Sequence, residues 1–154
     1  MRVRLGVPVL RPCALSVLLA LVPPAAGAEQ PLVIIVHPDS GVLRLTREQA
    51  GNIFLGRERR LPSGLLALPV EQLLPPEDRV RFYQYLVHLP MSQVRALWAQ
   101  LYFSGQAQPP RQTRSSDETL EVVGANRGAI GFLEKGLLDR RVRAVLELGE
   151  QGSP

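Results

Sequence analysis

Three groups of residues in this sequence could together hold a small oxyanion. Arginine grips an oxyanion through a planar fork of N–H donors. Serine hydroxyls and backbone N–H groups at a helix start or a strand end could complete such a site. The three groups are Arg79, the pair Ser40 and Gly41, and the segment formed by Arg114, Ser115 and Ser116.

Arg79 lies on the apolar side of a predicted helix, where a charged residue is unusual. The segment from Glu77 to Val87 has apolar residues at helical spacing, and Arg79 falls within that arc in the first turn. An inward-pointing arginine at a helix start should face whatever lies beyond the strand ends. A salt bridge to Glu71, Glu77 or Asp78 is the alternative explanation, and the sequence leaves both open.

The serine-containing groups have structural explanations as well. Ser40 and Gly41 follow a predicted strand, where open α/β sheets place their ligands, although an ordinary turn explains them too. Ser115 and Ser116 begin a predicted helix after Arg114, so they form either an oxyanion nest or a plain N-cap.

Residue patterns for other chemistry are missing from the sequence. It has neither a G-x-S-x-G motif nor a P-loop, and His37 and His88 lack the spacing of a metal-binding pair. The single cysteine, Cys13, lies in a segment that we expect to be removed. We therefore expect no catalysis, no metal and no cofactor.

The first 28 residues have the pattern of a secretory signal peptide. Basic residues precede an apolar run from Ala14 to Val22, and the small residues Ala26 to Ala28 follow. The run is too short for a membrane span, which needs about 20 residues. We expect cleavage after Ala28 and a soluble, periplasmic product.

The remaining chain is suited to one globular domain, expected over residues 29–148, with a flexible tail over 149–154. The net charge of the whole chain is +4, from 18 basic and 14 acidic residues. Three of the basic residues lie in the predicted signal peptide, so the rest of the chain is close to neutral. This balance argues against nucleic acid as a partner.

Hydrophobic patterning predicts an α/β fold, with strands separated by helices and some parallel pairing. The run from Leu32 to His37 is a continuous apolar segment, which is typical of a strand buried on both faces. Further strands are expected over 65–70, 129–133 and 141–148, and helices over 46–55, 77–87, 92–104 and 115–123, with a connection over 106–113. Thr46 and Gln49 have capping-box spacing at the start of the first helix. Helical spacing of apolar residues predicts that Val80, Trp98 and Tyr102 lie on buried helix faces.

Several motifs, in this order, resemble the phosphate-type substrate-binding proteins of ABC transporters. They span roughly residues 32–134, which is most of the chain after the predicted signal. The motifs are Ile53-Phe54-Leu55-Gly56-Arg57 with Leu61-Pro62-Ser63-Gly64 and Leu68-Pro69-Val70, Arg79 with Phe82-Tyr83, Trp98 with Phe103-Ser104-Gly105 and Pro109-Pro110, and Asn126-Arg127-Gly128-Ala129-Ile130-Gly131-Phe132.

The resemblance implies an α/β, single-lobe, periplasmic-binding-protein-like domain of the second type, with a mixed β-sheet and flanking helices. It also implies phosphate or a similar small oxyanion as the ligand and a role in ABC-type uptake or sensing. Members of this family hold phosphate with helix-start N–H groups, hydroxyls and an arginine, which here points to Ser40, Gly41, Arg79, Arg114, Ser115 and Ser116.

Two departures from the family support an alternative function. The full family has two lobes that close over the ligand, whereas this chain has the length of one. The serine-rich phosphate loop is replaced by Leu73-Leu74-Pro75-Pro76-Glu77-Asp78, in which prolines lack N–H donors and carboxylates repel phosphate. The alternative is a non-ligand-binding interaction module that docks on a membrane sensor or transport component, with the loop from Arg57 to Arg60 as a contact.

Overall fold

A five-stranded mixed sheet forms the centre of the computed structural model, which describes residues 30–149. The strand order is β3-β2-β4-β1-β5, with β2 parallel to β3 and β4, and β1 antiparallel to β4 and β5. The expected signal peptide and most of the expected tail lie outside the described residues. The strands are β1 (Leu32–Val36), β2 (Leu68–Gln72), β3 (Arg111–Thr113), β4 (Ala129–Glu134) and β5 (Arg143–Leu148).

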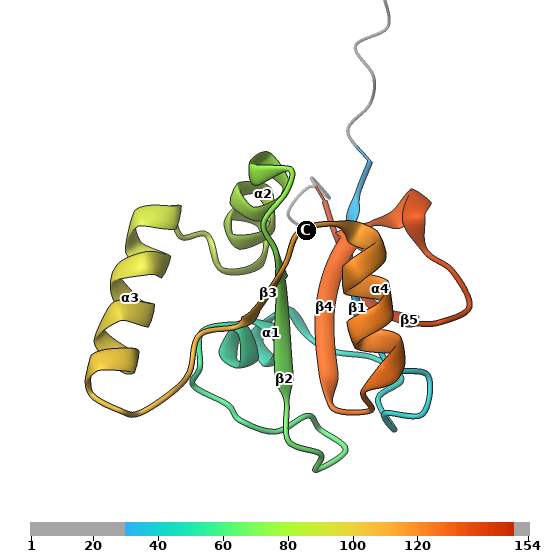
Figure 1. The fold of residues 1–154 in the computed structure, drawn as a ribbon, viewed down its shortest axis with the longest axis horizontal. Helices are drawn as coiled ribbons and strands as arrows, with labels where there is room; N and C mark the ends of the chain where they lie inside the picture. Colours follow the sequence, from blue (N-terminus) through green and yellow to red (C-terminus); the bar gives the residue numbers. More distant parts are fainter. Residues whose placement is uncertain (1–29, 150–154) are drawn as a thin grey trace, which may run out of the picture.

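Helices cover both faces of this sheet, which confirms the mixed α/β architecture expected from the sequence (Figure 1). The helix α4 packs on one face, while α1 and α2 pack on the other and α3 stands outside α2. No helix within residues 30–149 combines the length and apolar character needed to cross a bilayer. The helices are α1 (Arg47–Phe54), α2 (Pro76–Val87), α3 (Met91–Phe103) and α4 (Ser116–Ala125), with a short 3-10 turn, η1 (Lys135–Leu137).

The strand β1 is buried on both faces, as its continuous apolar run predicts. Successive side chains of a strand point to opposite faces, so Leu32, Ile34 and Val36 enter the core on the side of α1 and α2. Val33 and Ile35 enter the smaller core beneath α4. All five residues are fully buried, which places β1 between the two helical layers.

Three phenylalanines from different motifs meet in the larger core. Phe82 of α2 stacks on Phe132 of β4 with ring centroids 3.8 Å apart and an interplanar angle of 9°. Phe54 of α1 meets Phe82 edge-to-face at 4.7 Å. The edge-to-face pair has the geometry that aromatic rings prefer, and such a pair adds about 0.5–1.5 kcal/mol beyond the burial of area. This cluster therefore fixes α1 and α2 against the middle of the sheet.

The helix α1 has the ends that its sequence predicts. Thr46 and Gln49 form a capping box, in which each side chain accepts a hydrogen bond from the other's backbone N–H. Gly56 follows the helix with a φ of +71°, a conformation that favours glycine. A side chain at Gly56 would also lie 2.8 Å from the Trp98 indole, so this glycine lets α3 approach α1.

The structure corrects several details of the predicted elements. The second strand begins at Leu68 rather than Leu65, and the segment expected to be a connection contains the short strand β3. Val80 and Tyr102, predicted to be on buried helix faces, are at least half exposed. Periodicity missed β3 because three residues are too few to show an alternating pattern.

Two glycines allow close packing around β4: Gly128 in the turn before the strand and Gly131 within it. A Cβ atom at Gly128 would lie 2.2 Å from the carbonyl oxygen of Leu66, where the parallel pairing of β2 with β4 begins. A Cβ atom at Gly131 would press on Thr119 and Val123 of α4 at 3.2 Å. The backbone of β4 therefore touches both a neighbouring loop and a helix where larger residues would not fit.

We expect Gly128→Ala to lower the free energy of unfolding by about 1–3 kcal/mol or more, because the clash is with backbone that cannot rotate away. Urea denaturation followed by circular dichroism measures the change. Gly136→Ala is the matched control, since Gly136 is exposed and a Cβ atom there has no neighbour nearer than 3.9 Å. Equal stability of the two variants would contradict the close approach at Gly128.

Candidate functional site

The carboxyl ends of β2 and β3 bring together two of the three predicted groups. Because these strands are parallel, residues that follow them emerge at the same edge of the sheet. Arg79 lies in the first turn of α2, which follows β2, and Arg114 to Ser116 follow β3. The two groups nevertheless lie on opposite faces of the sheet. Arg79 contacts Glu71, whereas Ser116 contacts Gln72. These two strand residues are consecutive, so their side chains point to opposite faces.

Arg79 forms an ion pair with a buried carboxylate. Its Nη2 atom lies 2.8 Å from Oε2 of Glu71, and the side chains are 22% and 2% exposed, respectively. The salt-bridge alternative for Arg79 is therefore realised, with Glu71 rather than Glu77 or Asp78 as the partner. A cation is needed beside this carboxylate, because an unpaired buried charge is strongly destabilising.

The ion pair leaves several buried polar atoms without a hydrogen-bond partner. Nε of Arg79 and Oε1 of Glu71 are unpaired, so the guanidinium and the carboxylate do not form a double hydrogen bond. The Tyr83 hydroxyl and the Trp98 indole N–H are also buried and unpaired. Native proteins contain few such atoms. We call these four residues the Arg79 cluster.

The Tyr83 hydroxyl is the shared neighbour within the Arg79 cluster. Burial raises the pKa of Tyr83 well above its usual value near 10, and the negative charge of Glu71 raises it further. Arg79 and Trp98 act on it in the opposite direction. Hydrogen bonding to the Glu71 carboxylate also raises the pKa of Tyr83, and hydrogen bonding with the Trp98 N–H lowers it. The hydroxyl therefore lies close to both groups, although neither contact meets strict hydrogen-bond geometry.

The helix start at α4 is satisfied within the protein. The Ser115 hydroxyl accepts a hydrogen bond from the backbone N–H of Glu118, which is the N-cap arrangement. The Glu118 carboxylate accepts one from the backbone N–H of Arg114 at 2.8 Å. The Ser116 hydroxyl donates to Oε1 of Gln72 at 3.0 Å. Both serine hydroxyls therefore have structural partners.

The start of α2 also differs from a helix start that binds phosphate. Pro75 and Pro76 provide no N–H donors, and Glu77 and Asp78 occupy the first turn. Asp78 is buried and forms an ion pair with Arg81, which also pairs with Glu134. The positive end of this helix is therefore balanced by the protein's own carboxylates.

The structure places Ser40 and Gly41 away from the other candidates. They follow β1, which runs antiparallel to β4, so they lie at the end of the sheet where β2 begins. The buried Ser40 hydroxyl accepts a hydrogen bond from the N–H of Val42, and Gly41 has a φ of +77° beside Ser63. A single ligand cannot join this turn to Arg79, and the turn explanation accounts for both residues.

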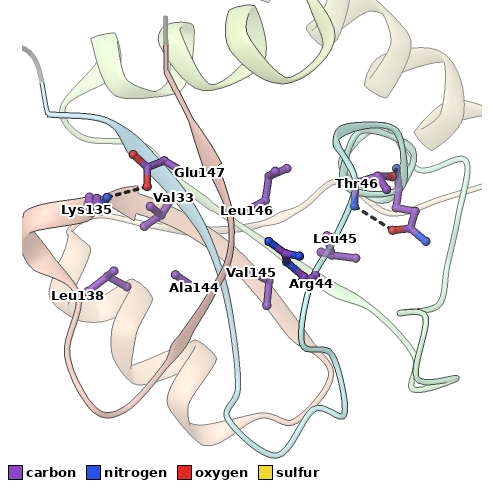
Figure 2. A pocket seen from close by; sticks show the side chains of 11 residues that line it. Val33, Arg44, Leu45, Thr46, Lys135, Leu138, Ala144, Val145, Leu146 and Glu147 are labelled. Atoms are coloured by element: carbon purple, nitrogen blue, oxygen red, sulfur yellow. Dashed lines mark hydrogen bonds and ion pairs between the residues drawn. The ribbon is translucent and has the colours of Figure 1, made fainter. Parts of the chain in front are cut away.

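A hollow of about 570 Å³ runs along the outer side of β5. Figure 2 shows Lys135 and Glu147 paired at one end of it and Thr46 at the other. None of the predicted ligand residues lines this hollow. Within residues 30–149, no three histidine, cysteine, aspartate or glutamate side chains gather as a metal site would require.

Sequence patterns singled out Arg79 but did not assign it to a cluster. Glu71 lies one residue beyond the strand predicted over 65–70, between Val70 and Gln72, so no sequence pattern indicated its burial. Tyr83 follows Arg79 by four residues and therefore shares its helix face. Trp98 lies in an apolar helical stripe, which predicts a core residue, and its ring is buried. That its N–H lacks a partner depends on how α3 meets α2.

Two solved structures have this fold. An ABC-type phosphate transport receptor from Vibrio cholerae matches with a TM-score of 0.60 at 20% sequence identity, over 75% of this chain and 45% of the receptor. A substrate-binding protein assigned to a phosphate ABC transporter of Clostridium perfringens, solved with phosphate bound, matches with a TM-score of 0.61 at 18% identity. That match covers 75% of this chain and 44% of that protein.

The chain has the fold seen in part of phosphate ABC transporter substrate-binding proteins. This result confirms the fold that the sequence motifs suggest. The chain spans less than half the length of the solved structures it matches. No protein-family model and no curated protein sequence matches it.

Removing one partner of the Arg79–Glu71 pair should destabilise the protein more than removing both. Arg79→Met leaves the Glu71 carboxylate buried without a countercharge, and we expect a loss of about 3–5 kcal/mol. The double variant Glu71→Gln, Arg79→Met should be more stable than Arg79→Met alone, so its loss should be clearly less than the sum of the two single losses. Urea denaturation of the four proteins gives the coupling energy. Additive losses would show that the pair contributes no interaction.

Tyr83 should make the protein less stable in alkali. The unfolded chain ionises tyrosine near its usual pKa of about 10, whereas the folded protein keeps Tyr83 protonated. The unfolded state therefore binds fewer protons above about pH 10, and the free energy of unfolding falls by up to about 1.4 kcal/mol per pH unit. Denaturation between pH 8 and 11 measures this slope.

The Tyr83→Phe variant should flatten the alkaline slope, because phenylalanine carries no ionisable hydroxyl. Tyr102→Phe is the control, since Tyr102 is exposed on α3. Equal slopes for Tyr83→Phe and the parent protein would contradict the raised pKa.

Proposed function

We propose that this protein is an exported, periplasmic solute-binding domain that takes a phosphate-like oxyanion at the Arg79 cluster, for ABC-type uptake or sensing. The observation that supports this is the incomplete ion pair of Arg79 with Glu71, beside two further unpaired donors. Its fold is that of substrate-binding proteins, one of which was solved with phosphate bound.

The chemistry of the Arg79 cluster is suited to an oxyanion that still carries a proton. Arg79 Nε, the Tyr83 hydroxyl and the Trp98 N–H are three donors, and an oxygen atom of the ligand would accept from them. Oε1 of Glu71 is an acceptor, which favours a ligand with a hydroxyl group and repels a fully ionised one. Inorganic phosphate is protonated at neutral pH, whereas sulfate is not.

The partial exposure of Arg79 provides the route by which an anion could reach the cluster. Its side chain is 22% exposed, while Glu71 is 2% exposed. An anion bound from this side would remain partly in water, where each charged contact is weaker than in a closed site. We therefore expect weak binding by the isolated domain.

A second candidate function is an interaction module without a ligand, docking on a membrane sensor or transport component. It is favoured by the start of α2, where prolines and carboxylates replace phosphate-binding donors, and by the internal partners of Ser115 and Ser116. In this case the ion pair of Arg79 would be structural.

Phosphate should raise the melting temperature of the purified protein, measured against sulfate at matched ionic strength. A ligand at about 100 times its dissociation constant adds about 2.7 kcal/mol of stability, which is a shift of several degrees for a domain of this size. The increase should be absent in Arg79→Lys, which keeps the charge but loses the guanidinium Nε donor. Arg95→Lys is the control, since Arg95 is exposed on α3.

Two results would decide against phosphate binding at the Arg79 cluster. A flat melting temperature in phosphate would leave the interaction module as the function. An equal increase with sulfate and phosphate, or an increase that Arg79→Lys retains, would show a general ionic effect or a site elsewhere.

A further inference from the structure

Three loops meet beside the carboxyl end of β1, at the lower right of the view in Figure 1. Arg127, in the turn between α4 and β4, donates from Nε to the backbone carbonyl of Asp39 at 2.9 Å. Arg143 begins β5 and pairs with the last residue of β1. The loop after β1 continues beside β5, where the N–H of Leu45 donates to the carbonyl of Val145 at 3.1 Å. The three loops are residues 37–46, 126–128 and 139–143.

Most of the arginines in these loops have no countercharge. The loops contain five arginines and two aspartates, so their net charge is +3. Arg141 pairs with Asp139 and with Asp117 of α4. The other four are exposed and form no ion pair within residues 30–149. We call them the arginine surface: Arg44, Arg127, Arg140 and Arg143.

The opposite end of the sheet has a different charge balance. There, Arg79 pairs with Glu71, and Arg81 pairs with Asp78 and Glu134. The first turns of α2 and α4 add further carboxylates beyond the ends of β2 and β3. A negatively charged partner would therefore be attracted to the arginine surface rather than to the end that holds the Arg79 cluster.

Two leucines are exposed beside the arginine surface. Leu43 precedes Arg44 and is 72% exposed. Leu66 is 67% exposed, and its backbone carbonyl lies against Gly128, the residue after Arg127. Isolated exposed leucines are common. Leucines among unpaired arginines, however, have the chemistry of a membrane-binding surface, where cations contact headgroups and apolar side chains enter the boundary with the acyl chains.

We propose that the arginine surface binds an anionic phospholipid membrane, with Leu43 inserted below the headgroups. Guanidinium groups are suited to lipid phosphates, because their planar forks donate two parallel hydrogen bonds. An acyl layer takes up a projecting leucine without a matching hollow, whereas a protein partner would need one. The exposed leucines therefore favour a lipid surface over an acidic protein.

Membrane binding at the arginine surface is separate from anion binding at Arg79. The two places lie at opposite ends of the sheet, because Arg79 follows the carboxyl end of β2 and Arg127 precedes the start of β4, which is parallel to β2. A protein bound in this way keeps the Arg79 cluster directed away from the membrane. Arg79→Lys should leave membrane binding unchanged.

Sedimentation with lipid vesicles tests the proposal, using the purified protein after removal of the predicted signal peptide. We expect binding to vesicles of equal parts phosphatidylglycerol and phosphatidylcholine, and none to phosphatidylcholine alone. Binding should weaken as sodium chloride is added, because salt screens exposed charges. Sodium phosphate at the same ionic strength should release no more protein than sodium chloride does.

Variants assign the binding to this surface. Arg140→Gln and Arg143→Gln should each weaken it about fivefold, and neither removes a side-chain contact of the described residues. Leu43→Ser should weaken it about tenfold without changing the salt dependence. Arg95→Gln and Val80→Ser are the matched controls, since both residues are exposed, on α3 and near the start of α2. Their binding should remain within about twofold of the parent value.

Several outcomes would overturn the proposal. They include no binding to vesicles, binding that does not require anionic lipid, and binding that Arg140→Gln and Arg143→Gln leave unchanged. Release by phosphate but not by chloride would assign the arginines to the free ion. Polyglutamate that binds as tightly as the vesicles, with a loss in Arg140→Gln and no effect of Leu43→Ser, would assign the surface to an acidic protein.

Discussion

The stacking of Phe82 on Phe132 is the contact that positions the rest of the site. It joins α2 to the central strand β4, and Phe54 extends the cluster to α1. Phe82 lies three residues after Arg79, so the rotation of α2 that buries this ring also turns Arg79 toward Glu71. Three of the four groups of motifs that carry the resemblance to substrate-binding proteins each contribute one of these phenylalanines. Their shared role in packing explains why they occur together in one sequence.

The buried carboxylate of Glu71 gives this fold a different electrostatic character from a phosphate site built on helix starts. Such a site relies on free backbone N–H groups and the positive end of a helix. Here the starts of α2 and α4 carry carboxylates, and the Ser115 hydroxyl caps its own helix. The remaining donors come from side chains packed against Glu71. The proposed anion would therefore have to tolerate a carboxylate, which favours one that can donate a proton.

The sequence predicted elements well where local patterns were strong. The apolar run of β1, the capping box at Thr46 and the N-cap at Ser115 all appear in the structure as expected. The strand β3 was missed, because its three residues are held by parallel pairing with β2 rather than by an apolar pattern of their own. The exposure of Val80 and Tyr102 was also missed, since periodicity identifies an apolar face but not how much of it a neighbour covers.

The sequence by itself determined the α/β class and the inward direction of Arg79. These properties depend on composition and on spacing within one element, which are local. Tertiary structure alone decided which residues meet. It selected Glu71 among three acidic candidates for Arg79, because strand β2 ends beneath the first turn of α2. It separated Ser40 and Gly41 from the other candidates, because β1 runs antiparallel to β4. Strand direction is set by pairing between distant segments, and that pairing is not encoded in any single one of them.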